Sequence, residues 1–348
     1  MRYKLFGQHT GLRVSELVLG TGNFGTGWGH GAEPDEAGRI FDAYADAGGN
    51  FIDTADSYQG GQSEAILGTL LAGRRDHFLL ASKFSLRSDT NATILSAGNS
   101  RKAMVSSVEQ SLKRLKTDRI DLYWAHIDDG VTPMEEMLRG FDDLVRAGKI
   151  LYAGLSDFPA WRVARAATIA ELRGTVPIAG IQIEHSLVER TVEHELLPAA
   201  QALGLGVVAW SPLGGGMLTG KYRNGEKGRA EGFGGKVFQA ENSAQRTAIL
   251  DTLIAVAQEA GVTPGAAAIA WVAARGVLPI IGPRSLVQLQ DNLAAAEVRL
   301  SADQLARLDA ASAVPAPFPH ALLNAPDNRQ RYTGGKAALF DLPMHPAA

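Results

Sequence analysis

The 348-residue sequence predicts a (β/α)8 barrel, because eight short apolar segments alternate with stretches of helical periodicity. The segments show little polar alternation, as expected for parallel strands that are covered on both faces. No linker divides the chain, so we expect a single barrel domain over residues 1–348. The predicted strands are residues 17–20, 50–53, 78–83, 121–126, 152–156, 179–182, 206–210 and 277–281.

Helices are predicted between these strands. Apolar residues recur at intervals of three and four within residues 105–115 and 134–145, which places them on one helical face. Ser100 and Thr132 stand just before these two segments and are predicted as their N-caps. The alternative arrangement is an open, doubly wound sheet, which normally carries a glycine-rich dinucleotide turn after an early strand. Residues 20–25 (GTGNFG) have the last glycine at the wrong offset for such a turn, so the barrel is preferred.

Three segments fall outside the predicted barrel. Residues 4–14, with Gly7 and Gly11 in the turn, predict a hairpin that plugs the N-terminal end of the barrel. Residues 223–242 are rich in glycine and charge and predict a mobile loop after the seventh strand. Beyond Ala313 the chain is rich in proline and predicts an irregular tail, which either covers the barrel mouth or frays.

The composition narrows the class of partner. A net charge of −3 with no cluster of Lys or Arg gives no footprint for nucleic acid, so none is expected as a partner. No apolar run approaches the roughly 18 residues that span a bilayer, and the N-terminus has no stretch of signal-peptide length. The chain has no cysteine, which excludes thiolate nucleophiles and cysteine-ligated metals and favours a cytoplasmic location.

Four polar residues lie at or just after the ends of consecutive predicted strands. Asp53, Lys83 and His126 close the second, third and fourth strands, and Tyr58 follows Asp53 by five residues. Reactive groups of a (β/α)8 barrel come from the C-terminal ends of its strands. Because neighbouring strands lie about 4.8 Å apart, we expect these side chains to meet.

The four residue types together suit proton transfer to an oxygen. A phenol is a weak acid, but a nearby cation lowers its pKa. Lys83 can supply that cation, Asp53 can keep Lys83 charged and oriented, and His126 can hydrogen-bond the same substrate oxygen. Each residue alone also has a structural interpretation, as a cap, a core histidine, a snorkelling lysine or a wall residue. No nucleophile is present among the four and no metal-ligand spacing occurs, so a bound cofactor is expected to supply a hydride.

These four residues and the sequence segments around them resemble those of the aldo-keto reductase family. The resemblance runs from LVLGTGNFG to LQDNLAA and includes the four residues in order. It implies a (β/α)8 oxidoreductase that binds NADP(H), or less often NAD(H), across the barrel mouth and reduces an aldehyde or ketone to an alcohol. Tyr58 is then the general acid, Lys83 and Asp53 are its tuning pair, and His126 orients the substrate.

The resemblance also implies a set of cofactor-binding residues, spread from the first-strand loop to the last helix of the barrel. They are Gly22, Asn23, Phe24, Asp53, Ser156, Asp157, Gln182, Trp210, Ser211, Leu213, Gly214, Gly215, Lys221, Gly282, Arg284, Ser285, Gln288, Asp291 and Asn292. Arg284 is the expected partner of a 2′-phosphate. Gly214 and Gly215 let backbone N–H groups approach the pyrophosphate closely.

Three positions depart from the family pattern. Asp157 stands where the family usually has Asn, and an ionised acid accepts the nicotinamide carboxamide N–H but cannot donate to its oxygen. Gln288 replaces a second basic residue that many members carry, and Asp291 stands where Glu is usual. The preference for NADP over NAD therefore rests mainly on Arg284.

Aromatic residues in rim loops and strand ends are predicted to line a substrate site for apolar or cyclic carbonyls. They are Phe24, Trp28, His30, Trp124 and Phe158. Residues 86–99 and the C-terminal tail are expected to add walls, and residues 232–235 to close over bound cofactor.

Two other functions stay open. The segment WSPLGGGMLTGKY is also similar to channel-associated, cofactor-sensing relatives, so a non-enzymatic subunit is the main alternative. A lyase acting through a Schiff base on Lys83 is disfavoured, because Asp53 should keep that lysine protonated. The oligomeric state is not indicated by these residues.

Overall fold

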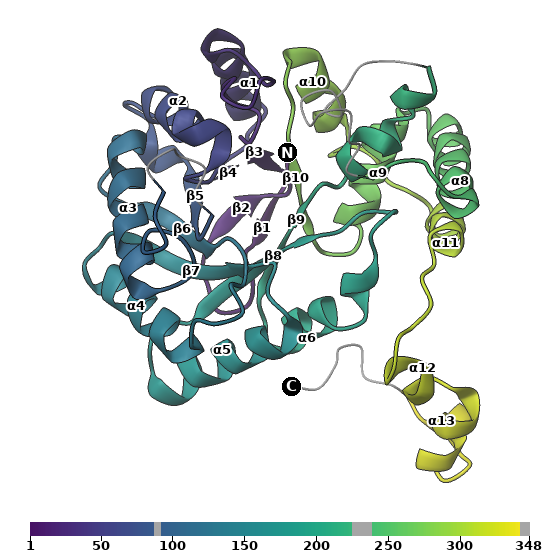
Figure 1. The fold of residues 1–348 in the computed structure, drawn as a ribbon. Coiled ribbons are helices and arrows are strands. Elements are labelled where there is room, and N and C mark those ends of the chain that lie inside the picture. The colour runs from purple at the N-terminus through teal and green to yellow at the C-terminus, as the bar shows by residue number, and fades with distance from the viewer. Residues whose placement is uncertain (87–91, 225–238, 342–348) are drawn as a thin grey trace.

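The computed structural model describes residues 1–86, 92–224 and 239–341, and its central feature is a closed parallel barrel surrounded by helices (Figure 1). The strands follow one another around the barrel in chain order, with the last beside the first, which rules out the open sheet. Each lies within two residues of its predicted range. The barrel strands are β3 (Val18–Gly20), β4 (Phe51–Asp53), β5 (Leu79–Phe84), β6 (Ile120–Ala125), β7 (Ile150–Ser156), β8 (Ile178–Glu184), β9 (Gly206–Trp210) and β10 (Leu278–Ile281).

The helices cover the outside of the barrel (Figure 1). Ser100 caps α3 as predicted, since its side chain accepts the backbone N–H of Ala103. The predicted cap at Thr132 is wrong: Pro133 precedes α4, and the Thr132 hydroxyl donates to the Asp129 carboxylate at 2.6 Å instead. The helices are α1 (Pro34–Asp46), α2 (Gln62–Leu70), α3 (Arg101–Leu115), α4 (Met134–Arg146), α5 (Ala160–Arg173), α6 (Leu196–Ala202), α8 (Ala244–Ala260), α9 (Pro264–Ala273), α10 (Leu286–Ala294), α11 (Ala302–Ala311), α12 (His320–Leu323) and α13 (Pro326–Tyr332).

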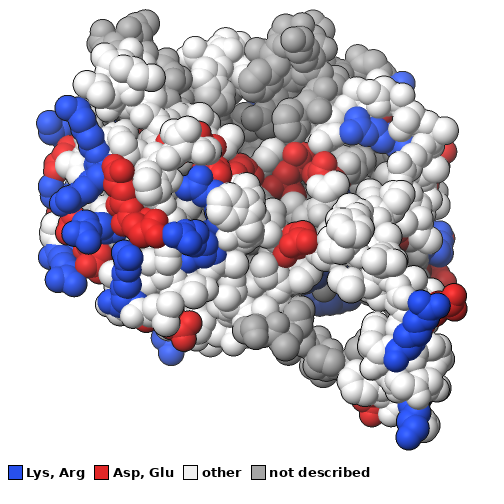
Figure 2. All heavy atoms as spheres, turned by 60° about the horizontal axis from the view of Figure 1, so that its bottom comes forward, with Lys and Arg blue, Asp and Glu red and all other residues white. Residues whose placement is uncertain are grey.

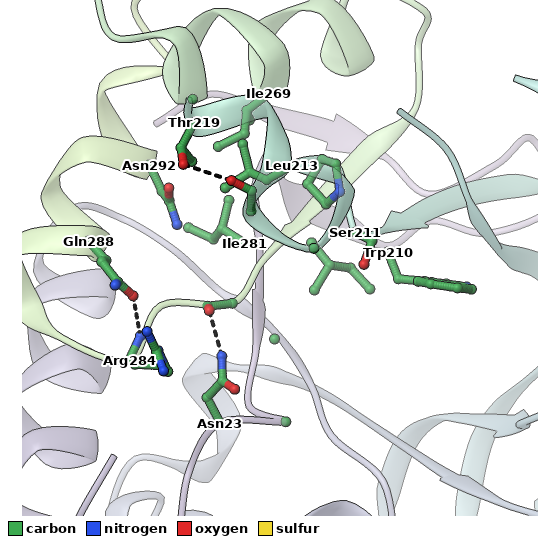
Figure 3. A pocket seen from close by; sticks show the side chains of 18 of the residues that line it. Asn23, Trp210, Ser211, Leu213, Thr219, Ile269, Ile281, Arg284, Gln288 and Asn292 are labelled. Carbon is green, nitrogen blue, oxygen red and sulfur yellow. Dashed lines mark hydrogen bonds between the residues drawn. The ribbon is translucent and has the colours of Figure 1, made fainter. Parts of the chain in front are cut away.

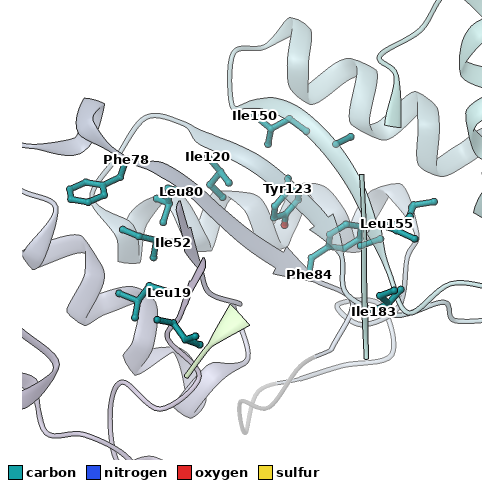
Figure 4. Packing of buried hydrophobic residues seen from close by; sticks show 14 of the residues in the cluster. Leu19, Ile52, Phe78, Leu80, Phe84, Ile120, Tyr123, Ile150, Leu155 and Ile183 are labelled. Carbon is teal, nitrogen blue, oxygen red and sulfur yellow. The ribbon is translucent and has the colours of Figure 1, made fainter. Parts of the chain in front are cut away.

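The core has an outer layer between strands and helices and an inner layer inside the barrel. Leu19, Ile52 and Leu80 come from neighbouring strands and belong to the outer layer (Figure 4). Phe51 and Leu79 alternate with them and belong to the inner layer. Both layers bury apolar side chains, which is the main stabilising contribution to such a fold.

The N-terminal hairpin, β1 (Tyr3–Leu5) and β2 (Arg13–Ser15), is antiparallel and closes one end of the barrel, as predicted. Phe6 is the residue that fills the opening: its ring lies 5.8 Å from that of Phe51 and 6.4 Å from that of Trp124. Strand glycines make this possible, since a Cβ at Gly180 or Gly206 would lie 2.6 Å from the Phe6 ring. The C-terminal end of the barrel is therefore the end left for a ligand.

The C-terminal tail differs from the prediction of an irregular segment. It contains the short helices α12 and α13 and stands away from the barrel at the lower right of Figure 1. His320 holds it against Glu195 at 2.6 Å and lies 6.0 Å from the ring of His194. None of the described tail residues lines the pocket discussed below.

The surface carries no dominant charge on the face in Figure 2, where acidic and basic side chains are interspersed. Most of the loop predicted at 223–242, including the glycines at 232–235, lies outside the described residues, as does 87–91 of the segment 86–99. Within the described residues, no single helix is long and apolar enough to cross a membrane. The pair α8 and α9 reaches that length and composition only together, across a 95° bend.

Candidate active site

A pocket of about 750 Å³ opens at the C-terminal end of the barrel. Its walls come from the loops after most of the strands and from the N-terminal ends of α9 and α10 (Figure 3). Asp53, Tyr58 and His126 all line it, and Lys83 lies directly beneath them. The structure therefore brings the four residues together, although they are up to 73 positions apart in the chain (126 − 53).

Lys83 is the centre of this group. Its side chain is fully buried on β5. The Nζ atom donates to the Asp53 carboxylate, to the Thr54 carbonyl oxygen at 2.9 Å and to the Tyr58 hydroxyl oxygen at 2.9 Å. The other Asp53 oxygen accepts from Gln182 Nε2 at 2.8 Å. Three donor–acceptor contacts thus fix the ammonium against the phenol.

The protonation state of Lys83 follows from these contacts. Burial alone would lower the pKa of Lys83, but the charges of Asp53 and Tyr58 and their hydrogen bonds raise it above its ordinary value. The side chain is therefore a permanent cation at neutral pH. A charged amine is a poor nucleophile, which argues against Schiff-base chemistry at this position.

His126 follows β6 directly and is placed by its backbone, whose N–H donates to the Phe84 carbonyl oxygen at 2.9 Å. Its ring meets the Tyr58 ring edge-on, with centroids 5.8 Å apart. Burial, and secondarily the charge of Lys83, holds the pKa of His126 well below its usual value. The imidazole is therefore neutral near pH 7 and can donate an N–H without itself adding charge.

Most of the residues predicted to bind a cofactor also line this pocket. Asn23 spans two of its loops by donating to the Gly282 carbonyl oxygen at 2.7 Å, and the Gln288 side chain accepts the Arg284 backbone N–H at 2.9 Å (Figure 3). The set at the pocket is Gly22, Asn23, Asp53, Ser156, Asp157, Gln182, Trp210, Ser211, Leu213, Gly215, Lys221, Gly282, Arg284, Gln288, Asp291 and Asn292.

Three predicted cofactor residues do not line the pocket. Phe24 is fully buried, and its ring packs in the outer core layer. Gly214 lies beneath the pocket wall, where a Cβ would come within 2.7 Å of the Val188 side chain. Ser285 uses its hydroxyl to cap α10, accepting the Gln288 backbone N–H at 3.3 Å.

The five residues predicted to line a substrate site do not lie together at the pocket. Trp28 does line the pocket, with its ring 6.0 Å from that of Tyr58. His30 lies behind it, with Nδ1 3.3 Å from the Trp28 carbonyl oxygen. Trp124 points into the barrel one layer below the mouth, and Phe158 packs in the outer core beside the Arg162 guanidinium, 5.7 Å away. Of the five predicted residues, Trp28 lines the pocket, and His30, Trp124, Phe158 and Phe24 do not.

The N-terminus of α9 is a pocket wall that the sequence reasoning missed. Thr263, Pro264 and Gly265 all line the pocket. The Thr263 hydroxyl accepts the Ala266 backbone N–H at 3.1 Å and donates to Asp291 at 2.7 Å. The pair Thr-Pro before an apolar run is a helix-start signature and could have revealed this end. A helix N-terminus carries partial positive charge and binds anions.

Asp157 has an unusual backbone and an unusual carboxyl group. Its φ of 53° is in the left-handed region, as is the φ of 52° at Ser211. Oδ1 accepts the indole N–H of Trp210 at 3.0 Å, and Oδ2 accepts the Ser156 hydroxyl at 3.3 Å. Burial raises the pKa of Asp157 to about 6, against the opposing effects of these hydrogen bonds and of Lys83. Strained residues of this kind gather at functional sites.

The fold and the site define a (β/α)8-barrel protein with a pocket and a cluster of polar groups at the C-terminal rim, which is where enzymes of this fold carry their active sites. Comparison with known families identifies the particular one: the model of the Aldo/keto reductase family matches residues 16–313, and the chain belongs to that family. The protein is accordingly an oxidoreductase, of a family that acts on small-molecule carbonyl compounds. No group of three or more His, Asp or Glu within the described residues is arranged to hold a metal.

Curated relatives match over most of their own length. The uncharacterized oxidoreductase YrpG of Bacillus subtilis is 40% identical, over 89% of this chain and 95% of its own. The putative aryl-alcohol dehydrogenase AAD14 of Saccharomyces cerevisiae is 32% identical, over 92% and 89%. The norsolorinic acid reductase of Aspergillus flavus is 34% identical, over 91% and 82%.

Proposed function

We propose that the protein reduces an aldehyde or ketone to an alcohol with NADP(H), and that Tyr58 is the general acid. The observation that carries this proposal is the 2.9 Å contact between the Lys83 ammonium and the Tyr58 hydroxyl oxygen at the pocket floor. An adjacent cation favours release of a phenolic proton, which is what a general acid needs. The nicotinamide, when bound, supplies a hydride to the carbonyl carbon.

The four residues divide the work on the substrate oxygen. Tyr58 gives its proton to the oxygen, and Lys83 stabilises the phenolate that remains. Asp53 compensates the Lys83 charge from the other side, so the buried pair is neutral. His126, as a neutral imidazole, donates an N–H to the same oxygen and fixes the direction of the carbonyl.

The pocket suits an extended dinucleotide. Its volume lies in the range of small-molecule sites. Gly215 and Gly216 have φ values of 63° and 94°, a backbone that can turn N–H groups toward phosphate oxygens. The N-termini of α9 and α10 add positive potential at the same wall. Trp210 can cover a nicotinamide face, while Lys221 and Arg284 carry charge for the phosphates.

Preference for NADP(H) over NAD(H) rests on Arg284. Its half-buried side chain lines the pocket beside α10, and a guanidinium pairs with a phosphate through two parallel hydrogen bonds. Trp28, next to Tyr58, favours a planar or aromatic carbonyl in the substrate position. The relatives named for an aryl alcohol and for norsolorinic acid agree with such a substrate.

The proposal is tested by two measurements on the purified protein. Titrations followed by fluorescence compare NADPH with NADH, and NADPH is expected to bind more tightly. A panel of carbonyls, with 4-nitrobenzaldehyde as the reactive reference, is then assayed for NADPH consumption matched by alcohol formation. Tight NADPH binding with no turnover across the panel, together with a co-purifying protein, would favour the cofactor-sensing subunit instead.

A further inference from the structure

A carboxylate lies at the end of the pocket where the reaction takes place. Asp157 lines the pocket together with Tyr58, Gln182 and Trp210. The charge of Lys83, whose Nζ touches the Tyr58 hydroxyl oxygen, acts on the Asp157 carboxyl group. A ring that delivers hydride beside Tyr58 must therefore lie within electrostatic reach of Asp157.

The hydrogen-bond donors that contact the Asp157 carboxyl group in the described structure are uncharged. They are the Trp210 indole N–H and the Ser156 hydroxyl, at 3.0 and 3.3 Å. Lys83 is the nearby cation, and it is already paired with Asp53. Glu184, at the end of β8, also senses the charge of Asp157, but it does not line the pocket and accepts from Gln239 at 2.9 Å. An ionised Asp157 thus leaves the catalytic end of the pocket with net negative charge.

The two redox forms of a nicotinamide differ in charge at the ring. The oxidised ring is a pyridinium with one positive charge, and the reduced ring is neutral. A fixed carboxylate inside a partly desolvated pocket attracts the pyridinium but not the dihydro ring. An asparagine at the same position would be neutral and would not distinguish the two forms in this way.

We propose that Asp157 biases the bound cofactor toward its oxidised form, so that this site holds NADP⁺ more tightly, relative to NADPH, than a neutral residue would allow. The inference rests on the proposed function, since it takes the ligand to be a nicotinamide dinucleotide. Its consequence is a reaction direction: by thermodynamic linkage, tighter binding of NADP⁺ shifts the on-enzyme equilibrium toward NADP⁺ and alcohol, and therefore toward carbonyl reduction. Asp157 is a positioning residue here, because it also holds the Trp210 indole.

The test measures binding without substrate, so it does not depend on turnover. Dissociation constants of NADP⁺ and NADPH are measured by calorimetry for the unmodified protein, Asp157→Asn, Asp157→Ser and the control Asp327→Asn. Both Asp157 variants should raise the ratio Kd(NADP⁺)/Kd(NADPH) by about tenfold, as expected for the loss of one interacting charge. Asparagine tolerates the left-handed backbone at this position. Asp327→Asn removes a carboxylate from the exposed tail, which does not line the pocket, and should leave the ratio unchanged.

The possible failures are separable. An unchanged ratio in both folded Asp157 variants, with both cofactor forms still bound, overturns the role of Asp157 and leaves the proposed function intact. A shift of the same size in Asp327→Asn also overturns it, because the effect would then not depend on a carboxylate inside the pocket. Absence of binding of either form to the unmodified protein contradicts the proposed function itself.

Discussion

Lys83 Nζ lies 2.9 Å from the Tyr58 hydroxyl oxygen, so a buried lysine touches the phenol that packs beside His126 at the pocket floor. The contact joins the end of β5 to the loop after β4. Lys83 Nζ also donates to the Asp53 carboxylate and to the Thr54 carbonyl oxygen. If the ammonium turned away, these buried acceptors would lose their hydrogen bonds. This geometry underlies the predictions that follow.

Replacing Lys83 by Met removes the cation while keeping the length of the side chain. Carbonyl reduction should fall by about 10²-fold or more, because the phenolate left on Tyr58 loses its stabilising charge. The variant should also be less stable by about 3–5 kcal/mol, since it leaves the Asp53 carboxylate buried and unpaired. Thermal melts and steady-state assays with 4-nitrobenzaldehyde measure the two effects.

The matched control is the double variant Asp53→Asn with Lys83→Met. It removes both charges, so most of the lost stability should return while turnover stays low. Recovery of turnover in the double variant would show that Lys83 acts only by supporting the fold.

His126 should stay neutral between pH 6 and 8. Burial and the Lys83 charge hold the pKa of His126 well below its ordinary value. Below about pH 6.5, His126 therefore binds a proton more readily in the unfolded chain than in the folded protein. The stability that this residue contributes is thus present at neutral and higher pH and is lost as the pH falls. Carbon NMR of histidine-labelled protein, assigned with His126→Gln, should show no titration of His126 in that window. A midpoint at about pH 6.5, as for free imidazole, would contradict the neutral assignment.

Arg284→Ala should weaken NADPH binding by about 10–100-fold, because it removes a charge-assisted contact to the 2′-phosphate. NADH, which lacks this phosphate, should bind with nearly unchanged affinity. Lys336→Ala is the control, because it removes the same charge from the exposed tail, away from the pocket. Fluorescence titrations with both cofactors measure the selectivity. Equal losses for NADPH and NADH would place Arg284 on a part of the cofactor that both share.

The affinity for NADP⁺, relative to NADPH, should rise with pH through about 6. Below the Asp157 pKa of about 6 the carboxyl is neutral, and above it the carboxylate attracts the pyridinium. Lys83 stays charged and His126 neutral over this range, and the 2′-phosphate titrates in both cofactor forms and cancels. Glu184, whose pKa burial also raises, is checked with Glu184→Gln. The same pH response in Asp157→Asn would exclude Asp157 as its source.

The strands and the four polar residues were predictable because their signals are local. Short apolar runs mark buried parallel strands, and a polar residue at the end of such a run stands out. The barrel topology then brings Asp53, Lys83 and His126 to one rim without further information.

The direction of aromatic side chains was not predictable in the same way. Trp124 sits two residues before His126 and shares its strand face, so it points into the barrel one layer deeper and meets Phe6. Phe24 and Phe158 lie in loops, where no periodicity says which side is buried. The Thr-Pro pair at Thr263 marks a helix start, but the place of that helix end at the pocket depends on the path of the chain after β9, which the local pattern does not encode.

The most direct test of the account is Tyr58→Phe, which removes one hydroxyl and keeps the ring. With NADPH saturating, turnover of 4-nitrobenzaldehyde should fall by about 10²–10⁴-fold, while NADPH binding, measured separately by fluorescence, stays within a few fold of the unmodified protein. Tyr3→Phe, which removes an exposed hydroxyl from the N-terminal hairpin, should change neither quantity. Undiminished turnover in Tyr58→Phe would contradict the assignment of Tyr58 as proton donor.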